Sequence, residues 1–121
     1  PGIGRTDSET KSNVLGGPDA KFGMDTETII QACVLAKSLG VQEFGIHMMT
    51  GSNVTNIDYW EELVDKLFEL LNKLNHQNIP VLYINLGGGI GIDYKTGISL
   101  DIENLAIKIG NKLEKIAKNI N

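Results

Sequence analysis

The hydrophobic positions of this chain recur mostly at helical spacing. The pattern predicts three amphipathic helices, over about residues 26–39, 57–74 and 101–118. Asp25 and Asn56 stand directly before the first two helices and are good N-caps, because a side-chain oxygen there accepts a free N–H of the first turn. The helix over 57–74 carries the longest apolar stripe, so we expect one of its faces to be buried.

Two short apolar runs separate the predicted helices. Residues 43–49 and 80–86 are typical of buried strands in a parallel sheet. Residues 1–25 and 90–99 are punctuated by glycine and polar residues and are predicted to be loops. Alternating helices and strands predict an α/β protein, either an open doubly wound sheet or an arc of a (β/α)8 barrel. A barrel needs about 250 residues, so 121 residues would form about half of one.

Composition and charge exclude several functional classes. The net charge of -4 argues against general nucleic-acid binding, which needs a basic surface. No apolar run approaches the ~18 residues that would span a bilayer. The single cysteine, Cys33, cannot form an internal disulfide, so a cytoplasmic location is the expectation. The chain starts at Pro1 rather than at methionine, which we interpret as the sign of a fragment.

The glycines after the second apolar run are the strongest candidates for chemistry. Gly87, Gly88 and Gly89 directly follow a predicted strand, where exposed N–H groups can form an anion-binding nest. The spacing fits neither a P-loop, since no Gly-Lys-Ser/Thr follows, nor a dinucleotide-binding loop, since no helix begins promptly. The glycines alone leave two alternatives, a phosphate site and a plain tight turn.

A second candidate site follows the first apolar run. Ser52 offers a hydroxyl for a phosphate or carboxylate. His47 is a candidate acid–base or ring-stacking group, with a packed, hydrogen-bonded histidine as the alternative. Met48 and Met49 belong to the same candidate site, and the alternative to a role there is that they simply pack in the core.

The remaining polar residues predict less chemistry. No cysteine pair or clustered histidine pair is present, so we expect no metal site. His76 is expected in an exposed turn. The carboxylates of the second predicted helix are expected to form its solvated face; they are Asp58, Glu61, Glu62, Asp65 and Glu69.

Taken together, the motifs resemble those of the fold-type III pyridoxal-phosphate-dependent decarboxylases. The resemblance implies an N-terminal, alanine racemase-like (β/α)8 barrel that binds pyridoxal 5′-phosphate (PLP), a C-terminal β domain and a homodimer. Residues 1–121 would be the central part of that barrel. The residues that carry the resemblance are 1–4, 16–23, 45–52 and 85–91, together with Tyr94.

The resemblance also implies roles for individual residues. Those matching the family's phosphate-contacting positions are Ser52, Gly87, Gly88 and Gly89. Lys21 and Phe22 match a stretch that lies toward the dimer interface.

The ring-contacting position differs from the family pattern. The family motif has two histidines, of which the second stacks on the cofactor ring. His47 matches the first, and Met49 stands in place of the second. A methionine sulfur can also pack against an aromatic ring, so we expect both residues to lie at the cofactor.

The family's Schiff-base lysine and its C-terminal active-site motif correspond to positions outside this chain. We therefore expect the full-length protein to be a decarboxylase of an acyclic amino acid and the polypeptide 1–121 alone to be inactive. Diaminopimelate is the expected substrate, with ornithine, arginine and carboxynorspermidine as alternatives. A non-catalytic PLP- or phosphate-binding module is another alternative, and an unrelated α/β domain would have no affinity for PLP.

Overall fold

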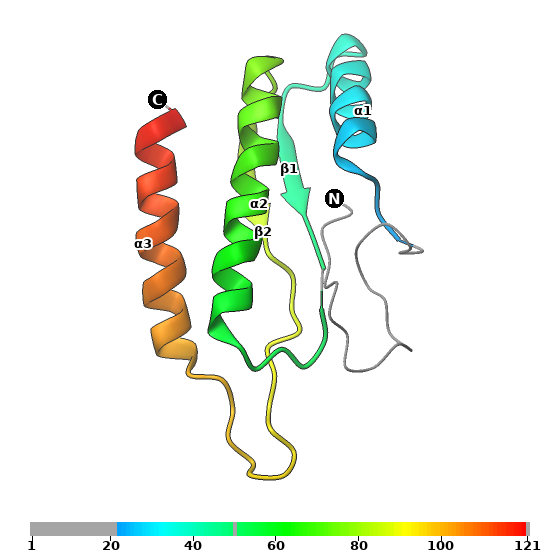
Figure 1. Ribbon diagram of the computed structural model, residues 1–121. Helices are drawn as coiled ribbons and strands as arrows, with labels where there is room; N and C mark the ends of the chain where they lie inside the picture. Colours follow the sequence, from blue (N-terminus) through cyan, green and yellow to red (C-terminus); the bar gives the residue numbers. More distant parts are fainter. Residues whose placement is uncertain (1–21, 50, 121) are drawn as a thin grey trace.

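The computed structural model describes residues 22–49 and 51–120 (Figure 1). The predicted helices are confirmed within two residues at each end, and the strands are shorter than predicted by one or two residues at each end. In chain order the elements are α1 (Thr26–Ser38), β1 (Phe44–His47), α2 (Ile57–His76), β2 (Val81–Asn85) and α3 (Ile102–Ile120).

Both predicted N-caps are confirmed. Asp25 Oδ1 accepts the N–H of Thr28 at 2.8 Å, and Asn56 Oδ1 accepts the N–H of Asp58 at 2.9 Å. These bonds satisfy donors that the first turn of a helix leaves free. His76 is exposed, as expected, but it ends α2 rather than lying in a turn.

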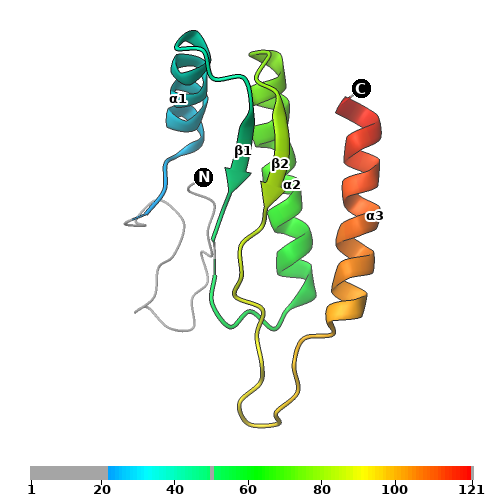
Figure 2. The ribbon, with the colours of Figure 1, turned by 180° about the vertical axis from the view of Figure 1, so that it is seen from behind.

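The two strands form a parallel sheet with α2 against one face. Gly45 lies opposite Tyr83 and His47 opposite Asn85. Figure 2 shows both strands in front of α2, with α1 and α3 to either side. The parallel pair joined through a helix confirms the α/β class. The described residues do not close into a barrel.

The core lies between the sheet and α2. One stripe of α2 is buried as the pattern predicts, and it packs with the inward side chains of β1 and with residues of α1 and α3. Burial of these side chains removes apolar surface from water, which is the main stabilising contribution to such a fold. The core includes Ile29, Phe44, Ile46, Met48, Trp60, Leu63, Leu67, Leu70, Leu74 and Leu105.

Strand β2 is not the buried strand that its apolar run predicts. Leu82 is 62% exposed and Tyr83 is 67% exposed. The helices cover one side of the sheet, and no described element lies over the other (Figure 2). Neighbouring side chains of a strand point to opposite faces, so the uncovered face accounts for only one of these two residues. In the described two-stranded sheet β2 also has an unpaired edge. A parallel strand is buried only when other elements surround it, so the prediction of a buried strand is wrong for the described residues.

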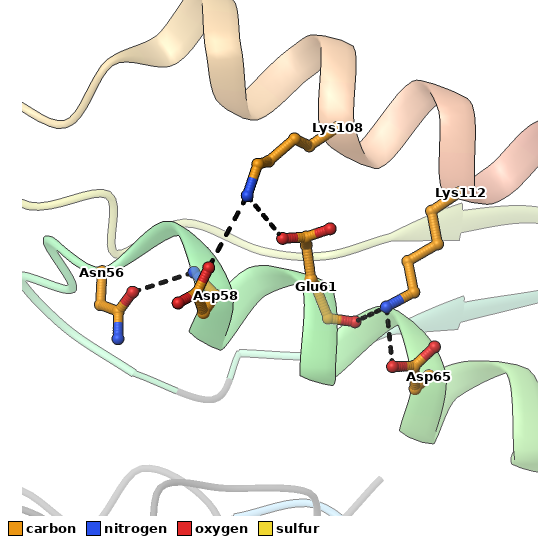
Figure 3. A network of polar contacts seen from close by, with 6 residues as sticks. All are labelled: Asn56, Asp58, Glu61, Asp65, Lys108 and Lys112. Carbon is orange, nitrogen blue, oxygen red and sulfur yellow. Dashed lines mark hydrogen bonds and ion pairs between the residues drawn. The ribbon is translucent and has the colours of Figure 1, made fainter.

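The acidic face of α2 is not simply solvated. Lys108 Nζ lies 2.8 Å from Glu61 Oε2 and 3.7 Å from Asp58 Oδ1. Lys112 Nζ lies 2.7 Å from Asp65 Oδ2 and 2.9 Å from the Glu61 carbonyl oxygen. Figure 3 shows both lysines reaching from α3 to α2. The hydrogen bond to Glu61 raises the pKa of Lys108. Three of the five predicted solvent-facing carboxylates therefore join two helices.

The cap at Asp25 predicts a specific pH dependence. The hydrogen bonds from Thr28 lower the pKa of Asp25 in the folded protein. Its stabilising effect is therefore present above the unfolded pKa of about 3.9 and is lost as pH falls through the folded pKa. Asparagine caps a helix without titrating. We expect the Tm of the full-length protein to fall more between pH 6 and pH 3 than that of Asp25→Asn. Thermal melts followed by circular dichroism test this, and parallel pH profiles would contradict it.

Candidate functional site

The candidate site lies at the end of the sheet where both strands finish. Because β1 and β2 are parallel, the residues that follow them leave from the same edge (Figure 1). The predicted motifs come directly after each strand. In α/β folds this edge is the usual place for ligands.

Two hydrogen bonds close the segments after the strands into a ring of backbone. Met48 N–H donates to the Asn85 carbonyl oxygen at 3.0 Å, and Val54 N–H donates to the Gly89 carbonyl oxygen at 2.8 Å. Between these bonds, no hydrogen bond joins the described residues of the two segments. We call residues 48–49, 51–54 and 85–89 the strand-end ring.

Glycine is required at two positions of the strand-end ring. Gly87 and Gly89 have φ values of 78° and 97°, a region that favours glycine. A Cβ at Gly87 would overlap the Met48 carbonyl oxygen, and one at Gly89 would overlap that of Gly51. The same Cβ at Gly89 would lie 3.4 Å from Ser52 Cα. The glycines therefore let the two backbones touch and bring Ser52 beside the glycine run.

Gly88 differs from its neighbours. A Cβ there would meet no heavy atom within 4 Å, so this position faces open space. The N–H of Gly87 donates to Asn85 Oδ1 at 2.8 Å. In the described part of the chain, the N–H groups of Gly88 and Gly89 have no hydrogen-bond partner. These two N–H groups and the hydroxyl of Ser52, an exposed residue, are donors of the kind that hold a phosphate.

The side chains of β1 and the residues after it alternate between the two faces. Ile46 and Met48 are buried, with Met48 only 2% exposed, whereas His47 and Met49 are exposed. The alternative of core packing is therefore right for Met48 and wrong for Met49. The alternative of a packed histidine is wrong for His47. Both exposed side chains belong to the face of the sheet opposite α2.

Residues 90–99 contain no helix or strand, which confirms the predicted loop, and a single isolated bridge closes this loop on itself. Ile92 and Ser99 form an antiparallel bridge, and Asp93 N–H donates to the Ile98 carbonyl oxygen at 2.9 Å. The Asp93 carboxylate accepts the N–H of Lys95, which lowers its pKa. An aspartate at such a turn is a signal that sequence inspection can use.

Two asparagines of the site were given no individual role from the sequence, although Asn85 begins the motif over residues 85–91. Asn85 accepts the Gly87 N–H, and Asn53 Oδ1 accepts the Ile92 N–H at 2.9 Å. The Asn85 contact is local and follows the common Asx turn. The Asn53 contact spans 39 positions, so no local sequence pattern predicts it.

The other predicted features have separate outcomes. Lys21 lies outside the described residues. Phe22 is 66% exposed. The described residues contain no cluster of three or more side chains suited to a metal ion. None of their helices is long and apolar enough to cross a membrane.

Comparison with known proteins places the chain in a family. Residues 3–121 match the family described as pyridoxal-dependent decarboxylase, pyridoxal binding domain. The chain belongs to this family. Its domain is the one that binds PLP, so PLP is the cofactor. No solved structure matches the chain.

Individual relatives are decarboxylases of amino acids. Diaminopimelate decarboxylase of Thermoplasma acidophilum is 32% identical over 117 residues, which is 95% of this chain and 29% of the relative. That of Aquifex aeolicus is 32% identical over 81 residues, 66% of this chain and 19% of the relative. Biosynthetic arginine decarboxylase of Geotalea daltonii is 32% identical over 81 residues, 65% of this chain and 13% of the relative. The chain thus spans less than a third of each relative.

Proposed function

We propose that this chain supplies the phosphate-binding part of the cofactor site in a PLP-dependent amino-acid decarboxylase. The observation that best supports the proposal is the strand-end ring. It combines an open position at Gly88, two N–H groups without partners among the described residues, and Ser52 beside Gly89. A phosphate dianion needs several converging donors, and backbone N–H groups supply them without bringing in a charged side chain.

In this proposal the residues of the site divide into two groups. The N–H groups of Gly88 and Gly89 and the hydroxyl of Ser52 bind the phosphate. Gly87 lets the loop approach the segment after β1, because any Cβ there would overlap the Met48 carbonyl oxygen. When bound, PLP supplies an electron sink for the negative charge left by departing carbon dioxide.

His47 and Met49 are proposed to contact the cofactor ring. Both are exposed on the face of the sheet opposite α2, at the end of β1 that leads into the strand-end ring. Met49 is 50% exposed, which leaves its thioether available for an aromatic surface. His47 adds a polar group that can donate or accept a hydrogen bond.

We further propose that residues 1–121 are a central part of a (β/α)8 barrel within a homodimeric enzyme. The exposed apolar side chains of β2 support this arrangement, because further strands and a filled barrel interior would bury them. Lys21 and Phe22 are proposed to lie near the dimer interface.

The proposed reaction is decarboxylation of meso-diaminopimelate to L-lysine, a step of lysine biosynthesis. Relatives named diaminopimelate decarboxylase, one of which aligns with 95% of the chain, support this substrate. Arginine is the second candidate, because relatives named biosynthetic arginine decarboxylase reach a similar identity over 65% of the chain. Ornithine and carboxynorspermidine are further candidates with the same fold.

Assays of the full-length protein test this proposal. With PLP added, we expect carbon dioxide release from meso-diaminopimelate with kcat/KM at least a hundredfold above the values for L-arginine and L-ornithine. Preference for arginine or ornithine would overturn the substrate and leave the cofactor site in place. PLP binding without turnover of any of these amino acids would instead favour a non-catalytic module. Absence of PLP binding would overturn the proposed site.

A further inference from the structure

We propose that Asn53 is a positioning residue that fixes the Ser52 segment against the glycine run. This inference rests on the proposed function, because it concerns how the phosphate donors of that site are held in place. Asn53 itself is assigned no contact with the cofactor.

The backbone of Asn53 is the first observation. Its φ is 53°, and among the described non-glycine residues only Asn53 and Asn78 have positive φ. Asparagine tolerates this left-handed conformation better than most residues. The turn at Asn53 lies between Ser52, which is beside Gly89, and Val54, which is hydrogen-bonded to Gly89.

The side chain of Asn53 is the second observation. Its Oδ1 accepts the N–H of Ile92 at 2.9 Å. Next to this bond, Val54 N–H donates to the Gly89 carbonyl oxygen at 2.8 Å, and Gly91 N–H donates to the Val54 carbonyl oxygen at 2.9 Å. Three hydrogen bonds thus join residues 53–54 to residues 89–92, and one of them comes from a side chain.

Close backbone packing at the same place is the third observation. Gly91 is buried, and a Cβ there would lie 2.6 Å from the carbonyl carbon of Asn53. The segments are therefore in direct contact immediately after the phosphate donors. A small change in their register would move Ser52 relative to the N–H groups of Gly88 and Gly89.

Asn53 would therefore affect phosphate binding without donating a hydrogen bond to the phosphate itself. Without the Asn53 side chain, Ser52 and both N–H groups remain present, but their relative positions are less fixed. Donors that must be ordered on binding give weaker affinity than donors already in place. The loss of affinity should therefore concern the contacts to the cofactor phosphate and leave the contacts to its ring unchanged.

The test compares Asn53→Gly with Asn78→Gly in the full-length protein. Glycine keeps the left-handed φ at both positions, so each variant loses only a side chain. Asn78 has φ 56° and lies between α2 and β2, and its hydrogen bonds to Asn75 and Lys37 use backbone atoms of Asn78 that glycine retains. It is therefore a matched control, placed before β2, whereas the strand-end ring lies at the other end of that strand.

We expect Asn53→Gly to weaken PLP binding about tenfold, about 1.4 kcal/mol, and to shift the ³¹P resonance of bound PLP. Affinity for pyridoxal, which lacks the phosphate, should stay unchanged. Asn78→Gly should alter neither affinity nor the ³¹P shift. Titrations followed by cofactor absorbance and ³¹P NMR supply these values.

Ser52→Ala distinguishes failure of this inference from failure of the proposed site. If Ser52→Ala weakens PLP binding while Asn53→Gly does not, Asn53 has no positioning role and the phosphate site stands. If neither variant changes PLP affinity, the proposed site fails and the inference fails with it. Equal losses for PLP and pyridoxal in Asn53→Gly would show a general structural effect and would also overturn the inference.

Discussion

Gly88→Asp is expected to weaken PLP binding by at least a hundredfold in the full-length protein. A Cβ at this position meets no heavy atom within 4 Å, so the new side chain fits without displacing the backbone. In the proposed site it places a carboxylate beside the cofactor phosphate. Two like unit charges about 4 Å apart repel by roughly 4 kcal/mol at the effective dielectric of a protein surface. A hundredfold loss corresponds to about 2.7 kcal/mol, which lies within that repulsion.

Gly88→Asn is the matched control for this charge effect. The amide has nearly the shape of the carboxylate and no charge, so it should lower PLP affinity by far less. PLP titrations of both variants and the wild type separate shape from charge. Raising the salt concentration should recover part of the loss in the aspartate variant only. Equal PLP affinity of Gly88→Asp and the wild type would show that the phosphate binds elsewhere.

The helices of this fold are predictable because their signals are local. The apolar stripe of α2 places Leu63, Leu67 and Leu70 on one face, and all three are buried. Asp25 and Asn56 mark helix starts through hydrogen bonds that reach two or three residues along the chain. Such features depend on neighbours in sequence, so periodicity and residue type are enough to find them.

The exposure of β2 and the pairing of the acidic residues depend on what lies across from them. The apolar run at β2 has the composition of a buried strand, yet Tyr83 is exposed because only one face of the sheet is covered. Glu61 lies on a polar helix face, yet Lys108 meets it from a helix 47 positions further along. Residue types therefore predict whether a face of a helix or strand is polar or apolar. Which element packs against that face depends on the tertiary structure.

The candidate site is partly predictable from the sequence, less so than the helices and more so than the partners of β2 and Glu61. Ser52 and Gly89 are far apart in sequence, but each follows a strand, and parallel strands end at the same edge. Their proximity was therefore predictable from the element order. The bond from Ile92 to Asn53 was not, because it requires the register between two irregular segments. Sequence patterns thus indicate the donors of the site better than the residues that hold them.

The three glycines of the run are expected to respond unequally to alanine. Gly89→Ala should lower the free energy of unfolding by about 2–5 kcal/mol, since it adds left-handed strain of about 1–2 kcal/mol and overpacking of about 1–3 kcal/mol. Gly87→Ala should lose a similar amount, because its Cβ would overlap the Met48 carbonyl oxygen. Gly88→Ala should stay within about 1 kcal/mol of the wild type, since its Cβ faces open space.

Urea unfolding of the full-length variants without cofactor measures these differences directly. Omitting PLP matters, because a ligand that binds only the folded protein would add its own stabilisation. Gly45→Ala is an informative control, since its Cβ would meet the ring of Tyr83, an exposed side chain that can move aside, rather than backbone. A loss at Gly88 as large as at Gly89 would contradict the alternating geometry of the strand-end ring. The unequal pattern would show that two glycines serve the packing of the loop, while the glycine between them leaves its opening free for a ligand.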